Sequence, residues 1–193
     1  MLRFLIPQLA LRDLPPMMAV AAAGAMVAGV YGTLHDQVTY TISPEYFTKL
    51  KFDQFHYADF GFPDRVFAAE IGFLATCWVG FFGAWFLARR LIPKQPRSRA
   101  LRQISIGFAT ISACALLSAS IGFGYGLWRG SGADYASWQS TLSYLDIEND
   151  WAFIRVAYIH NASYLGGLVG LVLALAFVRP LRTPDPDPTR ISE

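Results

Sequence analysis

The chain has 193 residues, of which 54% are hydrophobic and only 16% are charged, and its mean hydropathy is +0.34. Because soluble domains carry about 25% charged residues, this composition argues against a soluble globular protein. A net charge of +2 without a basic, aromatic stripe argues against nucleic-acid binding, and two cysteines are too few for a disulfide-stapled scaffold. The composition is that of a polytopic membrane protein.

Apolar stretches long enough to cross a bilayer as helices, which takes about 20 residues at a rise of about 1.5 Å each, occur at four places. They cover about residues 14–34, 66–88, 103–128 and 156–178. The sequence therefore predicts an all-α membrane protein whose four transmembrane helices form two hairpins in a single domain, residues 1–178. We expect the remainder, residues 179–193, to be a disordered cytoplasmic tail.

The basic residues indicate how the chain is oriented in the membrane. Of the 16 lysines and arginines, 11 lie before the first span, in the connection 89–102 or after the last span. The two longer connections, 35–65 and 129–155, are rich in Asp and Glu instead. By the positive-inside rule, both termini are expected in the cytoplasm and both acidic loops outside.

The two outer loops carry signals for local structure. Apolar and polar residues alternate over 38–42, which predicts extended chain there. Ser43 is a suitable helix N-cap and Pro44 suits the first turn, so a short helix is expected to run to about Phe55. Apolar residues at helical spacing over 135–145 predict a second short helix. We expect both short helices to lie at the membrane interface.

A weak internal repeat relates the spans to one another. Two pairs of identical residues align the second and fourth spans at an offset of 90 residues: Arg65 with Arg155, and Gly80 with Gly170. The Tyr-Gly pair at residues 31–32 recurs at 125–126, an offset of 94. This pattern predicts two parallel hairpins related by an axis along the membrane normal. It also places Glu70 and His160 at equivalent positions, where they are expected to face each other.

Glu70 and His160 are the ionisable side chains inside the spans and define the candidate site. Because a charged group costs roughly 2.5–3.5 kcal/mol in a span, such residues face the protein interior and find a partner. A carboxylate beside an imidazole stabilises the charged form of each. Such a pair can move protons, bind a cation or merely hold two helices together. The pocket candidates are Glu70, His160, Asn161, Ser163, Tyr164 and Arg155, and the outer-loop candidates are His35, Asp36, Glu45 and Tyr46.

A metal site is an alternative interpretation of the same residues. Imidazole and carboxylate groups suit zinc, iron or manganese, and the candidate ligands are His35, Asp36, Glu45, Glu70 and His160. The sequence contains no H-E-x-x-H, C-x-x-C or pair of histidines at i and i+4. No cofactor is therefore predicted from a motif, and a divalent metal stays an open alternative.

The main functional hypothesis is an outward-facing polar pocket, in a polytopic inner-membrane protein, that binds or passes a small ion or polar solute. One alternative is a membrane-embedded metalloprotein or enzyme with a His/carboxylate site at the outer end. Another is a structural or assembly subunit of a membrane complex. No nucleophile elbow, phosphate-binding loop or dinucleotide fingerprint is present, so no catalytic residue is assigned and a non-enzymatic function is favoured. The expected partner is the lipid bilayer, with a membrane-protein partner or a homo-oligomer also open.

Two segments resemble those of a known group of proteins. Residues 35–55 read HDQVTYTISPEYFTKLKFDQF, and residues 155–167 read RVAYIHNASYLGG. They are similar to segments of a family of small bacterial four-span membrane proteins of unassigned function, which carry an HDQ[VI][TS]Y-x-[IV]-S-P-E-Y-F type outer-loop segment. The resemblance implies a multi-pass protein of the bacterial inner membrane and assigns no catalytic role.

Overall fold

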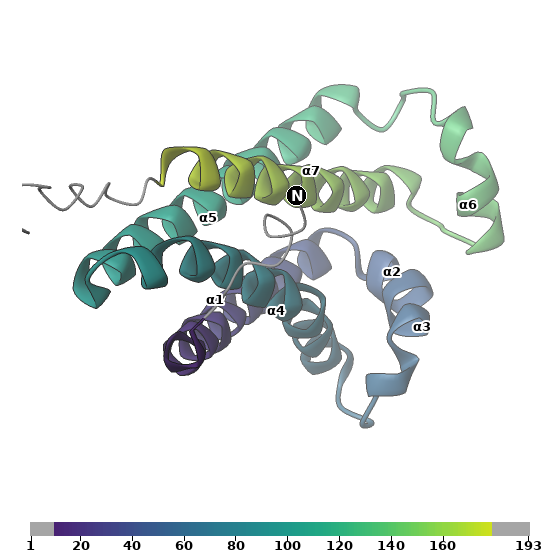
Figure 1. Ribbon diagram of the computed structural model, residues 1–193. Coiled ribbons are helices and arrows are strands. Elements are labelled where there is room, and N and C mark those ends of the chain that lie inside the picture. Colours follow the sequence, from purple (N-terminus) through teal and green to yellow (C-terminus); the bar gives the residue numbers. More distant parts are fainter. Residues whose placement is uncertain (1–9, 179–193) are drawn as a thin grey trace, which may run out of the picture.

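The computed structural model describes residues 10–178, which are helical and contain no strand. Its long helices are α1 (Leu14–Ile42), α4 (Asp64–Leu91), α5 (Arg97–Arg129) and α7 (Asp150–Phe177), as Figure 1 shows. All four are long and apolar enough to cross a membrane, which confirms the predicted all-α class and the predicted spans. The expected tail, residues 179–193, lies outside the described residues.

The long helices are arranged as two hairpins. Helix α1 packs along α4 to form the first hairpin, and α5 packs along α7 to form the second hairpin (Figure 1). Between the hairpins, α4 contacts α5 and α1 contacts α7, over shorter stretches. The first two long helices therefore pair with each other and the last two pair with each other, which confirms the predicted hairpins.

Close approach of the backbones holds each hairpin together. A Cβ atom at Gly32 would overlap the carbonyl oxygen of Gly72, and one at Gly72 would overlap that of Gly32. In the second hairpin, a Cβ atom at Gly122 would collide with the carbonyl oxygen of Tyr158 and the methyl group of Ala162. Small residues are needed at these crossings because backbones in a membrane gain most of their attraction from close packing.

The same crossings show how the two hairpins correspond. Contacts of the first hairpin recur in the second hairpin 90 residues later: Gly32–Gly72 as Gly122–Ala162, and Gly24–Gly80 as Cys114–Gly170. The same offset of 90 residues therefore relates α1 to α5 and α4 to α7. The offset of 94 predicted for the first and third spans is wrong by four residues, about one helical turn. Small residues that recur every turn make such neighbouring alignments look alike in the sequence.

The outer faces of the helices are apolar. Leu117 on α5 is 64% exposed, Ile121 is 72% exposed, and Leu168 on α7 is 60% exposed. Large apolar side chains at this level of exposure would be unfavourable in water and are typical of a surface that faces lipid. The exposed faces therefore support a bilayer as the surroundings of the four helices.

The two ends of the bundle differ in their connections. At the short-loop end, residues 92–96 join α4 to α5. At the long-loop end, residues 43–63 and 130–149 form two larger connections that contain further short helices (Figure 1). These are α2 (Pro44–Tyr46), a π-helical turn (Phe47–Lys51) and α3 (Phe52–Gln54) in the first connection, and α6 (Gln139–Tyr144) in the second.

The structure corrects the prediction of extended chain over 38–42. Helix α1 continues through this stretch to Ile42, because its buried positions keep a helical spacing that includes Asp36 and Thr39. The predicted cap at Ser43 is confirmed, since its hydroxyl oxygen accepts the backbone N–H of Tyr46 at 3.3 Å. The chain therefore turns once, at Ser43, and then resumes as the helical segment 44–54.

Candidate metal centre

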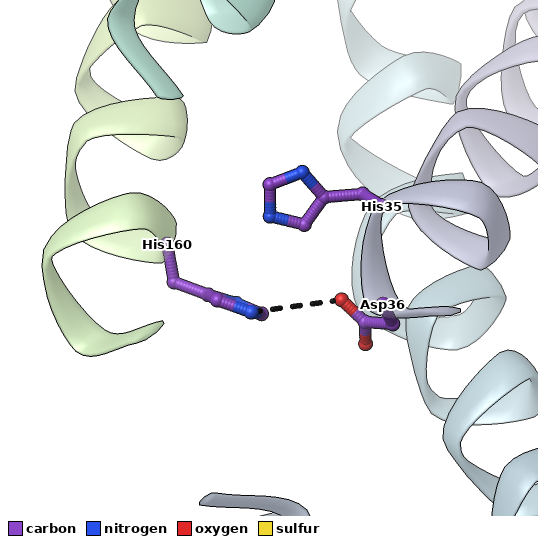
Figure 2. A group of neighbouring side chains, drawn as sticks. All are labelled: His35, Asp36 and His160. Carbon is purple, nitrogen blue, oxygen red and sulfur yellow. Dashed lines mark ion pairs between the residues drawn. The ribbon is translucent and has the colours of Figure 1, made fainter. Parts of the chain in front are cut away.

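Three side chains with metal-binding donor atoms meet near the long-loop end. His35 and Asp36 extend from α1 and His160 extends from α7 (Figure 2), so the two hairpins share the group. Their donor atoms all lie within 4.8 Å of one another, and Nε2 of His160 is 3.7 Å from Oδ1 of Asp36. Asp36 is 4% exposed and His160 is 3% exposed, so the pair is removed from solvent.

The helical period explains why α1 supplies several groups at this place. Asp36 and Thr39 are three residues apart and His35 and Thr39 are four apart, so all three lie on adjoining parts of one helix face. Oγ1 of Thr39 donates to the carbonyl oxygen of His35 at 3.1 Å and lies 3.2 Å from Nε2 of His160. The hydroxyl oxygen can therefore accept an N–H of His160, which satisfies a buried polar group.

Aromatic rings surround the histidines. The ring centroid of Tyr46 lies 5.0 Å from that of His160, and the ring of Phe47 lies 6.2 Å from it. Both residues belong to the 44–54 segment and are buried, so they cover the group at the long-loop end. Tyr31 packs its ring against His35 at 5.7 Å, one turn earlier on α1. A water-poor enclosure of this kind strengthens every charge interaction inside it.

Lys51 adds a positive charge close to the group. Its Nζ lies 5.8 Å from the ring centroid of Tyr46. Burial lowers the pKa of the Lys51 ammonium group, and the nearby Asp36 carboxylate opposes this shift. Burial also raises the pKa of the Tyr46 phenol, so this ring stays neutral at ordinary pH. The Asp36 carboxylate therefore faces two imidazoles and an ammonium group.

Glu45 was predicted as a site residue and as a metal ligand, but its carboxylate is bound elsewhere. Its two oxygens accept the backbone N–H groups of Glu148 and Asn149, each at 3.0 Å, and Lys49 is 3.0 Å away. Burial would raise the pKa of Glu45, but these hydrogen bonds lower it below its ordinary value. Glu45 thus fastens the 44–54 segment to the start of α7.

The predicted pairing of Glu70 with His160 is not observed. Among residues 10–178, the ion pair of His160 is with Asp36, and Glu70 is not part of the three-residue group. Oε2 of Glu70 is buried on α4 without a hydrogen-bond partner in the same part of the chain. The two residues do occupy equivalent repeat positions, but here α7 turns His160 toward α1.

The other predicted pocket residues divide into two sets. Ser163 and Tyr164 lie close to the group, because the Ser163 hydroxyl is 3.1 Å from that of Tyr31 and the Tyr164 ring is 6.1 Å from the ring of His160. Asn161 is exposed, and Arg155 packs against Trp151 instead. Two of these four predicted pocket residues, Ser163 and Tyr164, therefore lie beside the group.

Sequence reasoning missed four neighbours of the group: Tyr31, Thr39, Phe47 and Lys51. Tyr31 and Thr39 lie four residues before and after His35, so a helix through residue 42 would have placed them on its face. No comparable signal marks Phe47 and Lys51, because their positions depend on how the 44–54 segment folds back over the bundle.

The donor set fits a divalent transition metal. Two metal–ligand bonds of about 2.0–2.2 Å each allow donor atoms to be at most about 4.4 Å apart. The 3.7 Å between His160 and Asp36 is within this limit, and the donor atoms of the whole group lie within 4.8 Å of one another, slightly above it. Two imidazoles with one carboxylate are a combination suited to zinc, iron or manganese.

Comparisons with protein-family models, with curated proteins and with solved structures gave no match to this chain. The function must therefore be argued from the geometry of the site.

Proposed function

We propose that this chain is a multi-pass membrane protein that binds a small cation, specifically a divalent transition metal, at the centre formed by His35, Asp36 and His160. The observation that supports the proposal is that the donor atoms of these three side chains lie within 4.8 Å of one another, with Asp36 and His160 buried and His35 half-buried. Buried carboxylates and imidazoles without such a role carry a desolvation cost. A bound cation offsets that cost by replacing the lost hydration with direct ligands.

The orientation of the protein follows from its charge distribution. The basic residues gather at the short-loop end, which supports a cytoplasmic location for that end. The metal centre would then lie near the outer surface of the bacterial inner membrane. The 44–54 segment would separate it from the outside solution, and the bound ion would come from that side.

The proposal is tested with full-length protein purified in detergent, stripped with a chelator and then incubated with Zn²⁺, Fe²⁺ or Mn²⁺ in turn. The amount of bound metal is measured by elemental mass spectrometry, and the affinity by isothermal titration calorimetry. We expect about one equivalent in the wild type and at least a roughly tenfold loss of affinity in Asp36→Asn and His160→Ala, because each removes a ligand.

His56→Ala is the matched control, because His56 lies in the same connection and binds the carbonyl oxygen of Asp53, away from the group. It should bind metal as the wild type does. Failure of the wild type to retain any of the three metals, or equal retention by Asp36→Asn, would contradict the proposal.

A structural role is the second candidate, and one observation favours it. His160 already contacts Asp36 and Thr39 across the two hairpins, so the group can hold helices together without an ion. In that case, Asp36→Asn and His160→Ala should lower the melting temperature by the same amount with and without added metal. A stabilisation of the wild type by metal that both variants lack would exclude this candidate.

Binding and passage of an ion are separable by experiment. Reconstituted vesicles loaded with a metal-sensitive dye report influx, and the same vesicles with Asp36→Asn protein report the background. Influx that depends on Asp36 would extend the function to transport. Metal binding without influx would make the centre a resident one.

A further inference from the structure

Arg155 lies away from the metal centre, in the second turn of α7 at the long-loop end. Its guanidinium carbon is 4.3 Å from the ring centroid of Trp151 and 5.9 Å from that of Phe123. The Trp151 ring is itself fixed, because its Nε1 donates to the carbonyl oxygen of Gly126 at 2.8 Å. The guanidinium is therefore held in one place by rigid apolar surfaces.

The guanidinium of Arg155 has no hydrogen-bond acceptor or carboxylate partner in the described part of the chain. Its Nε is buried without a hydrogen-bond partner, and among residues 10–178 no carboxylate lies within ion-pair distance of its guanidinium. The Arg155 side chain as a whole is only half-buried, and no hydrogen bond joins its terminal nitrogens to another side chain or loop carbonyl of residues 10–178. A buried donor without a partner is unfavourable, and a ligand with acceptor oxygens at this guanidinium would supply the missing hydrogen bond.

The equivalent arginine of the first hairpin is in a different situation. Arg65, 90 residues earlier, donates to Gln37 at 3.5 Å and to Thr41 at 3.2 Å, and it lies 5.1 Å from the ring of Tyr40. The corresponding positions of the second hairpin hold Leu127, Ser131 and Gly130. Both hairpins therefore carry the arginine, but the residues that accept hydrogen bonds from Arg65 have no equivalent acceptor bound to Arg155.

A second arginine lies in the same neighbourhood. The guanidinium of Arg129 is 5.3 Å from the ring centroid of Tyr135 and donates to the hydroxyl of Tyr125 at 3.5 Å. Burial raises the pKa of Tyr135, and the positive charges of Arg129 and Arg155 both act against this shift. The surface around Arg155 is therefore positive and aromatic.

From this arrangement we infer that Arg155 is the centre of a binding site for a phosphate group at the long-loop end. The terminal N–H groups of arginine match phosphate oxygens in pairs. Gly126 of α5 lies against the Arg155 side chain, and the neighbouring rings of Tyr125 and Trp128 are exposed, as is usual at the level of lipid headgroups. A phospholipid headgroup and free inorganic phosphate both offer this chemistry.

The test uses delipidated full-length protein in detergent. Phosphatidylglycerol, inorganic phosphate and diacylglycerol are titrated separately, and binding is followed by native mass spectrometry and by the shift in melting temperature. We expect Arg155→Gln to weaken phosphate-group binding by about tenfold or more, and Arg155→Lys to have a smaller effect because it keeps the charge but loses the paired donors. Arg65→Gln is the matched control and should bind within about twofold of the wild type.

Each outcome decides the inference. Loss of phosphatidylglycerol binding in Arg155→Gln, with diacylglycerol bound by neither protein, supports a headgroup site. The same loss for inorganic phosphate at equal affinity supports free phosphate as the source. Equal losses in Arg155→Gln and Arg65→Gln, or no loss in a folded Arg155→Lys and Arg155→Gln pair, would overturn the site.

Discussion

At the scale of single residues, the candidate metal centre depends on the hydrogen-bond partners of the buried His160 imidazole. Its ring is buried between the two hairpins and has Thr39 at 3.2 Å and Asp36 at 3.7 Å as its polar neighbours. A buried imidazole that loses such a partner retains the full cost of its lost hydration. The threonine hydroxyl is therefore as much a part of the site as the three donor side chains.

We predict that Thr39→Val destabilises the protein by about 1–3 kcal/mol, because the substitution keeps the shape and removes the hydrogen-bond partner of His160. The free energy of unfolding in detergent, measured by denaturant titration, checks this prediction. Thr110→Val is the control, because Thr110 lies on α5 outside the group and the hydrogen bond from its hydroxyl to the carbonyl oxygen of Ile106 is solvent-exposed. Equal effects of the two substitutions would contradict the role given to Thr39.

At the scale of elements, the 44–54 segment covers the centre and is fastened by Glu45. The carboxylate accepts two backbone N–H groups just before α7, where the helix dipole is positive. The π-helical turn within the segment places Phe47 and Lys51 beside the histidines. Turns of this kind occur often at functional sites, since they redirect side chains locally.

The fastening by Glu45 should depend on pH. Because hydrogen bonds lower the pKa of Glu45 in the folded protein, its contribution to stability is present above its ordinary pKa of 4.5 and is lost as the pH falls through the lowered value. We predict that Glu45→Gln lowers the melting temperature at pH 7 and that its difference from the wild type shrinks below about pH 4. Thr48→Ala, at an exposed position of the same segment, changes no ionisable group and should differ from the wild type by the same amount at every pH. A difference between Glu45→Gln and the wild type that is constant with pH would refute the prediction.

The elements also show which features a sequence can predict. Hydropathy alone predicted four spans, and the Ser43-Pro44 cap predicted where a new helical segment begins. The stretch 38–42 was misjudged because an alternation of only a few residues fits a strand and one face of a helix equally well. The pairing of His160 with Asp36 rather than Glu70 depends on the rotation of α7 about its axis. Each residue turns a helix by about 100°, so a small error in rotation changes which helix a side chain faces.

At the scale of the whole molecule, two hairpins of the same design pack as a parallel repeat. The matching crossings at Gly32 and Gly122 show that both hairpins close in the same register. The side chains added to this common frame differ: α1 carries His35 and Asp36 of the candidate metal group, and α7 carries Arg155, whose Nε has no hydrogen-bond partner among the described residues. The repeat is therefore conserved in backbone geometry and has diverged in chemistry.

We predict that Gly32→Ala destabilises the first hairpin by about 1–3 kcal/mol, because the added methyl group would collide with the carbonyl oxygen of Gly72. Gly124→Ala is the control: nothing lies within 4 Å of a Cβ atom there, so the substitution should be neutral or slightly stabilising. Unfolding in detergent micelles measures both variants. A neutral Gly32→Ala would show that the helices cross less closely than described.

The division of the donor set between the two hairpins has a consequence for how the protein matures. During synthesis α1 reaches the bilayer before α7, so His35 and Asp36 enter the membrane before His160 is present. If the group binds an ion as proposed, the complete donor set would form only after the carboxy-terminal half has inserted and docked, so ion binding would be a late step of biogenesis. An ion bound to all three residues would cross-link the two hairpins, which insert one after the other. Before the ion binds, the two hairpins of a newly made chain would be held together less tightly.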